Sequence, residues 1–242
     1  MKPQILYSED YLSKKFVNIP ITEIQRKAQE DWLKLLDNGE LESETENYRN
    51  FEDIILRDLL NFPEEILRSG QNQENVEFVY KDPDGNWAVL FEAKGHETAD
   101  LFAKQHRMKK SQDSPYVQTD TNMGRFSGIS SGVCTNYQNF ILIDSFNRLT
   151  KCYEFDFLTT KNNDEKLKEF IGIFSYNALV LKKIHSTLHQ ESIEKDKEFT
   201  NEFYKLFHET RLMIIKAFKE KEKVSQTEAE LYAQIFLDRI IF

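Results

Sequence analysis

Apolar residues recur at helical spacing in two stretches near the start of the chain. The first covers residues 22–38 and opens with TEIQ, a sequence typical of a helix capping box. The second covers residues 43–62 and ends just before Pro63. The two patterns predict a pair of amphipathic helices, each with one face directed into a core.

A different pattern follows, in which β-branched and aromatic residues gather in short runs. Two such runs, residues 76–80 and 87–93, flank the turn sequence DPDGN and predict a β-hairpin. Further along we expect four elements: a helix over residues 96–110, a helix opened by Ser114 and Pro115, two strands within residues 132–144, and a short strand over residues 153–158. Helices and strands that alternate in this way predict an α/β domain.

The pattern becomes wholly helical from about residue 161. Three amphipathic segments follow, and the last is opened by a capping box of Ser225 and Glu228. We therefore expect an α/β domain over residues 1–160 and an all-α region over residues 161–242. Because the sequence stops inside an uncapped apolar run, we also expect the helical region to be truncated at its C-terminal end.

Composition narrows the class of protein. The chain has 242 residues, of which 40% are hydrophobic and 30% charged, with only 8 glycines and 5 prolines. This favours a folded, helix-rich protein over a disordered one. The net charge of −9 means that contact with nucleic acid would need a local basic patch or other parts of a larger protein. Cys134 and Cys152 lie in apolar surroundings, where buried free thiols are expected.

The location of the protein is also predicted by pattern. No apolar run approaches the roughly 18–20 residues that span a membrane. The first residues, MKPQILYSEDYLSKK, carry charges where a signal peptide needs its apolar centre. We expect a cytoplasmic protein with no membrane partner.

The sequence LFEAKG, residues 90–95, contains the strongest candidate chemistry. Glu92 and Lys94 are two apart on a strand, so their side chains point to the same face. Glu77 interrupts the apolar run of the preceding strand, where an ionised carboxylate is costly unless a cation meets it. Two carboxylates and a lysine on adjacent strands suit a metal-dependent phosphodiesterase. Ordinary cross-strand pairing on a solvated face is the alternative reading.

Other residues could complete such a site. Glu44 continues the apolar stripe of the second helix and could add a third carboxylate, or it could simply favour the helix dipole; Glu46 is the alternate. Gln118 could position a phosphate or a base. A basic cluster could meet phosphates or form a solvated face, and it comprises Lys104, His106, Arg107, Lys109 and Lys110.

Taken in order, these segments resemble the PD-(D/E)xK nuclease fold, in the form found at the N-terminus of type IIG restriction endonuclease–methyltransferases. FEAKG and CTNYQNFILID carry the resemblance most strongly, and it covers roughly residues 22–242. It implies a restriction-endonuclease-like domain with a central mixed sheet flanked by helices, followed by a helical connector. One departure is that the usual Pro-Asp of the first strand is Val76-Glu77 here, which lengthens the carboxylate arm by one methylene.

The resemblance also implies an activity and its site. The activity would be Mg²⁺-dependent, or Mn²⁺-dependent, hydrolysis of double-stranded DNA in a prokaryotic cell, as part of restriction–modification. Glu77, Glu92 and Lys94 would be catalytic, with the metal on Glu77, Glu92 and Glu44. Gln118, Lys104, Arg107 and Lys109 would support DNA binding.

The resemblance extends to partners outside this sequence. Methyltransferase and target-recognition domains would lie downstream, and S-adenosylmethionine would bind only there. Cleaving both DNA strands would call for a transient dimer.

Two alternatives stay open at this point. The chain could be the N-terminal nuclease of a type I restriction motor subunit, or a catalytically silent nuclease fold that docks DNA or a partner. No phosphate-binding, dinucleotide-binding or nucleophile-elbow motif supports another enzyme class. His185 and His189 have a zinc-compatible spacing but lack a third ligand, so a helix surface pair is expected.

Overall fold

The computed structural model describes residues 3–5, 7, 9–64, 67–68, 76–107 and 110–241. The chain forms two compact units, Met1–His189 and Gln190–Phe242. This division lies after His189, whereas the sequence predicts a boundary at residue 160. The reason is that Phe170 and Phe174 are fully buried in the core of the first unit, so the helix that carries them belongs to it.

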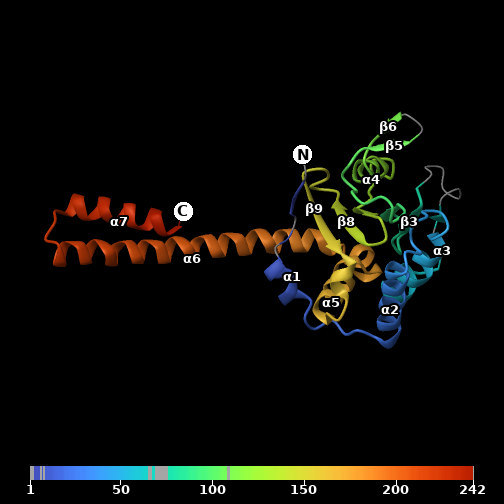
Figure 1. The fold of residues 1–242 in the computed structure, drawn as a ribbon, viewed down its shortest axis with the longest axis horizontal. Coiled ribbons are helices and arrows are strands. Elements are labelled where there is room, and N and C mark those ends of the chain that lie inside the picture. The colour runs from blue at the N-terminus through green and yellow to red at the C-terminus, as the bar shows by residue number, and fades with distance from the viewer. Residues whose placement is uncertain are drawn as a thin grey trace. The chain divides into compact units, whose positions relative to one another are not determined.

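A mixed β-sheet organises the first unit (Figure 1). Its strand order is β1-β9-β8-β7-β4-β3-β2. The bounds are β1 (Gln4–Ile5), β2 (Leu67–Arg68), β3 (Phe78–Lys81), β4 (Trp87–Ala93), β7 (Ser131–Thr135), β8 (Asn139–Asp144) and β9 (Lys151–Asp156). The strands expected at 76–80, 87–93, 132–144 and 153–158 are thus confirmed within a few residues.

Helices cover both faces of this sheet (Figure 1). One face packs an aromatic-rich core against α2 (Glu23–Asp37), η1 (Phe51–Leu59) and α5 (Asp164–Phe174). The other face packs a smaller core against α4 (Pro115–Met123). Strand β4 is buried on both faces, which explains its nearly continuous apolar sequence. An α/β fold with a central mixed sheet and flanking helices is therefore observed.

Several helix predictions are confirmed at the level of their caps. Thr22 and Gln25 form the reciprocal hydrogen bonds of the predicted capping box at α2. The Ser114 hydroxyl caps α4 by accepting from the Val117 amide. The second helix differs in form, because α3 (Tyr48–Asn50) continues as the π-helix η1.

The helix expected over residues 96–110 is wrong. Turns occupy residues 96–103, and the hairpin of β5 (Gln105–Arg107) and β6 (Lys110–Gln112) follows. The Thr98, Ala99 and Ala103 amides bond carbonyls only two or three residues back, so the backbone makes separate turns and not the four-residue bonds of an α-helix. The Asp100 carboxylate accepts from the Phe102 amide, a local bond that competes with helix formation.

The remaining helices complete the first unit and form the second. The first unit also contains α1 (Glu9–Lys15), η2 (Phe157–Thr160) and η3 (Asn177–Leu181). The first of the three helical segments expected after residue 161 is divided into α5, η3 and the start of α6 (Ile184–Lys221), which also contains the second segment. The second unit contains most of α6 and all of α7 (Gln226–Ile241), whose predicted Ser225–Glu228 capping box is present.

Three further predictions concern the cysteines, a histidine pair and membrane-spanning helices. Cys134 and Cys152 are buried free thiols, as predicted. His185 is only 2% exposed, so the surface pair expected with His189 is wrong. No helix in the described ranges is long and apolar enough to cross a membrane.

Candidate functional site

Glu77 and Glu92 face one another across the hairpin. Strands β3 and β4 are antiparallel with Phe78 opposite Phe91, and this register continued by one residue places Glu77 opposite Glu92. Both side chains are buried, with exposures of 8% and 5%. Like charges in directly opposed positions are destabilising. The hairpin therefore holds a costly feature that a nearby cation must offset.

Lys94 provides that cation. It follows β4, and its amide bonds Thr135 O at 2.8 Å, which ties this end of the hairpin to β7. Its ammonium Nζ lies 2.8 Å from Glu92 Oε1 and 3.2 Å from Glu77 Oε1. The side chain is 6% exposed, so these contacts are poorly screened by water.

Glu44 joins the same cluster from a different segment. Its carboxylate Oε1 lies 3.6 Å from Lys94 Nζ and accepts a hydrogen bond from the Tyr48 hydroxyl at 2.9 Å. Glu44 occupies the turn before α3, not the helix that the stripe predicted. The alternate, Glu46, is exposed. The structure thus brings together the four residues that were predicted to form the catalytic and metal site: Glu44, Glu77, Glu92 and Lys94.

Three contacts fix the segment that carries Glu44. The Tyr137 hydroxyl donates to Glu44 O at 2.7 Å, and the His96 amide donates to Leu41 O at 2.9 Å. A Cβ at Gly95 would lie 1.9 Å from Glu42 O, so only glycine permits this approach. Glu44 is consequently positioned by the residues immediately after Lys94 and by the β7–β8 turn.

Tyr137 itself has an unusual backbone. It is fully buried, and its φ of 72° lies in the left-handed region that bulky residues rarely adopt. Its amide donates to the Thr135 hydroxyl oxygen at 2.9 Å, and its carbonyl accepts from the Trp32 indole at 2.9 Å. This strained turn is where the motif CTNYQN meets the carboxylate cluster.

Asn122, which the sequence analysis missed, contacts the cluster from α4. Its amide donates to Glu92 Oε2 at 3.0 Å, so the two oxygens of Glu92 are held by Lys94 and Asn122. The predicted amide, Gln118, instead donates to Asp113 O at 2.6 Å. Asn122 lies four residues after Gln118 on the same helix, and that spacing was the available signal.

Of the basic residues expected near DNA, Lys104 and Arg107 lie in described segments that are separate from the carboxylate cluster. Lys104 is exposed in the loop before β5. Arg107 belongs to β5, which pairs with β6 and not with the central sheet. Lys109 lies outside the described residues.

The charges of the cluster are strongly coupled. Burial, together with the neighbouring Glu92 carboxylate, raises the pKa of Glu77 well above its usual range, although Lys94 opposes the shift. Burial alone would lower the pKa of Lys94, but the carboxylates of Glu77, Glu92 and Glu44 outweigh it and raise that pKa. Burial, followed by the Glu77 and Glu44 carboxylates, raises the pKa of Tyr48, which keeps its hydroxyl a donor.

Glu77 connects the cluster to an open cleft. A cleft of about 890 Å³ is lined by Glu77 and Phe78 and by side chains of α3 and η1. Arg49 and Arg57 line it together with Asp53, which pairs with both guanidinium groups. The cleft gives Glu77 a route to solvent, and its two arginines lie among five carboxylates: Glu46, Glu52, Asp53, Glu64 and Glu77.

The donor chemistry of the cluster fits a hard divalent cation. Glu77 Oε2 is buried and has no hydrogen-bond partner. The carboxylates of Glu77 and Glu92 are already stabilised by one cation, Lys94. Glu77 and Glu92 could hold Mg²⁺ or Mn²⁺, with Glu44 as a further oxygen donor. In the described part of the chain, however, no three His, Cys, Asp or Glu side chains form a ready-made metal shell. The carboxylates are arranged around Lys94 instead.

Comparison with known proteins adds no assignment. No family model, no curated protein and no solved structure matches the chain. The functional argument therefore depends on the geometry of the cluster.

Proposed function

We propose that the first unit is a metal-dependent deoxyribonuclease domain of the PD-(D/E)xK type that hydrolyses DNA phosphodiester bonds. One observation supports this above the others: Lys94 Nζ lies within 3.2 Å of two carboxylates that oppose each other on adjacent strands. A buried pair of like charges destabilises a hairpin, so its presence is typical of a functional site. The type IIG restriction enzyme remains the proposed full-length context.

The metal in this proposal is Mg²⁺ or Mn²⁺ on Glu77 and Glu92, with Glu44 as an additional donor. When bound, such an ion polarises a phosphoryl oxygen and lowers the pKa of coordinated water. DNA, and in a longer protein methyltransferase and target-recognition domains, are the proposed partners.

The residues of the chain have separate tasks in this proposal. Lys94 can donate a hydrogen bond to an attacking water and place positive charge beside phosphate oxygens that become more negative. Asn122 fixes the orientation of Glu92, and Tyr48 fixes that of Glu44. Arg49 and Arg57 in the adjoining cleft are candidates for contacts with the DNA backbone.

Cleavage of duplex DNA tests this proposal. The chain, at high protein concentration, is incubated with plasmid DNA and Mg²⁺ or Mn²⁺, alongside Lys94→Met and an EDTA control. We expect nicking or cutting that EDTA stops and that Lys94→Met lowers by at least about 1,000-fold, as for removal of a central catalytic group. Equal cleavage by the wild type and Lys94→Met would refute the assignment.

A second candidate function is supported by the arrangement around Lys94. Because Lys94 already compensates the carboxylates, the cluster could be a structural ion-pair network in a catalytically silent fold that docks DNA or a partner. Such a protein would bind no divalent cation at this site. It would keep its fold when Lys94 and both glutamates are replaced together by apolar residues of similar volume.

A further inference from the structure

The second unit is a helical hairpin with very little core of its own. The turn after Lys221 reverses the chain, and α7 lies beside the C-terminal part of α6 (Figure 1). Its cluster of buried apolar residues is Ile215, Ala229 and Ala233, with Ile214, Phe218 and Val224 partly buried around it. Two helices joined by so few buried side chains are normally stabilised by a further surface.

Helix α6 carries a second apolar face that does not face α7. We call it the outer stripe, and its residues are Phe203, Leu206, Thr210, Met213 and Ala217. Their spacing alternates between three and four residues, as in the a and d positions of a coiled coil. Leu206 and Met213 are 64% and 63% exposed, and Phe203 is 40% exposed. Large side chains left in water at this spacing predict a partner helix.

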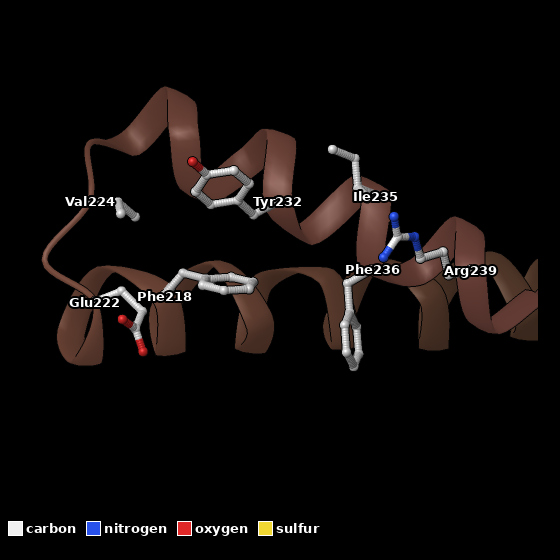
Figure 2. Close-up of a pocket in the computed structure, with 7 residues that line it drawn as sticks. All are labelled: Phe218, Glu222, Val224, Tyr232, Ile235, Phe236 and Arg239. Atoms are coloured by element: carbon white, nitrogen blue, oxygen red, sulfur yellow. The ribbon is translucent and has the colours of Figure 1, made fainter.

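An apolar groove widens this surface toward α7. Ile214, Ala217 and Phe218 of α6 and Phe236 of α7 line one hollow of about 210 Å³. An adjoining hollow of about 470 Å³ is lined by Phe218, Tyr232, Ile235 and Phe236, with Glu222 and Arg239 at the same hollow (Figure 2). The rings of Phe218 and Tyr232 contact each other, with their centroids 5.7 Å apart. Ala217 belongs to both the outer stripe and the groove, so the two form one continuous apolar surface.

The charges beside the outer stripe indicate which partner fits it. Glu202, Glu209 and Lys216 are seven residues apart, so they follow one flank of the stripe, and the sign of the charge changes after Glu209. When α6 pairs antiparallel with a second α6 about a twofold axis near residues 212 and 213, Glu209 meets Lys216 of the second copy on both sides of the axis. The flank is therefore complementary to itself.

The same alignment also matches the apolar residues. In its apolar layers Leu206 lies opposite Ala217 of the second copy, Thr210 opposite Met213 and Phe203 opposite Glu220, and the Glu209–Lys216 pairs flank these layers with an offset of two residues. Large side chains meet small ones at the first two of these positions. A parallel pairing would instead place Glu209 opposite Ile214 and leave the charge unmatched. We propose that this chain forms a homodimer in which α6 pairs antiparallel with α6 of a second copy through the outer stripe.

The proposal is independent of the nuclease activity, since it depends only on the second unit. A homodimer would present two copies of the first unit, which is the number that cleavage of both DNA strands requires. The isologous symmetry follows from the twofold axis, because each copy offers the same patch.

Sedimentation equilibrium of the whole chain tests the proposal. We expect a dimer for the wild type, and a dissociation constant at least about tenfold higher for Glu209→Lys and for Lys216→Glu, because each creates two like-charge contacts. The double variant Glu209→Lys/Lys216→Glu restores both contacts and should return the dissociation constant to within about threefold of the wild type.

Matched controls separate this contact from net charge. Glu198 and Lys205 are exposed on the side of α6 opposite the stripe, so Glu198→Lys and Lys205→Glu change the charge equally and should leave the dimer unchanged. Met213→Asp should give a monomer with an unchanged far-ultraviolet circular dichroism spectrum. A wild type that stays monomeric up to about 100 µM would overturn the proposal. A double variant whose dimer dissociation constant is as high as those of the single variants would overturn the proposal too.

Discussion

Replacing Glu77 with glutamine should stabilise the metal-free protein at neutral pH. Glu77 is 8% exposed, faces the Glu92 carboxylate, and has one buried oxygen without a hydrogen-bond partner. Glutamine keeps the shape of the side chain and an oxygen that can accept from Lys94, but it removes the charge. Because an unsatisfied buried charged group costs about 1–3 kcal/mol, we expect a gain in the free energy of unfolding of that size near pH 8.

The stability gain of Glu77→Gln should increase as the pH rises. The pKa of Glu77 in the folded protein is raised, first by burial and then by Glu92, above its ordinary value of 4.5. A raised folded pKa means that the stability contributed by Glu77 is fully present below about pH 4.5 and is lost as pH rises through the folded value. The glutamine variant lacks this loss, so its advantage should be absent below about pH 4.5 and grow by at most ~1.4 kcal/mol per pH unit above it.

Urea unfolding at pH 4.5 and pH 8, with EDTA present, measures both effects. The midpoint and slope of each transition give the free energy of unfolding, and an unchanged slope shows that the comparison is valid. Glu46→Gln is the control, since Glu46 lines the same cleft but is exposed, and it should change stability by less than about 0.5 kcal/mol. A Glu77→Gln protein less stable than the wild type at pH 8 would refute the reasoning.

Three further predictions concern the surroundings of Glu77. Lys94→Met leaves Glu77 and Glu92 without their cation. In urea unfolding it should lower the free energy of unfolding by about 3–5 kcal/mol at pH 8 and by less at pH 5. Equal losses at both pH values would contradict this prediction. Gly95→Ala brings a Cβ against Glu42 O and should cost about 1–3 kcal/mol in the same assay, whereas an unchanged stability would show that the 41–44 segment moves freely. Asn122→Ala should weaken Mn²⁺ binding about 10–100-fold in calorimetry, while Gln118→Ala should not; the reverse order would favour the sequence-based assignment.

The strands and most helix starts could be predicted because local chemistry specifies them. DPDGN supplies the turn of the β3–β4 hairpin, and Thr22, Ser114 and Ser225 cap helices with their own side chains. Glu77, Glu92 and Lys94 were predictable for a similar reason. A hairpin register and the two-residue period of a strand place them together without any long-range information.

The rest of the site depends on contacts between distant segments, which no local pattern contains. Asn122 reaches Glu92 only because α4 crosses between the parallel strands β4 and β7. The loop at residues 96–103 makes short-range turn bonds where a helix was expected, and its start is tied to a distant segment by the bond from the His96 amide to Leu41 O. Glu44 was chosen for its place on a helical stripe, yet it reaches Lys94 from a turn that Tyr137 and Gly95 hold in place.

A titration of the chain with Mn²⁺ tests the central claim most directly, because it needs neither DNA nor any other part of a longer protein. Isothermal calorimetry at about pH 7.5 would compare the wild type with Glu92→Gln, and Glu46→Gln would again serve as the exposed control. The account predicts Mn²⁺ binding by the wild type and the control, and its loss in Glu92→Gln. Absence of binding to the wild type, or equal binding to Glu92→Gln, would contradict the claim that Glu77, Glu92 and Lys94 form a metal-dependent nuclease site.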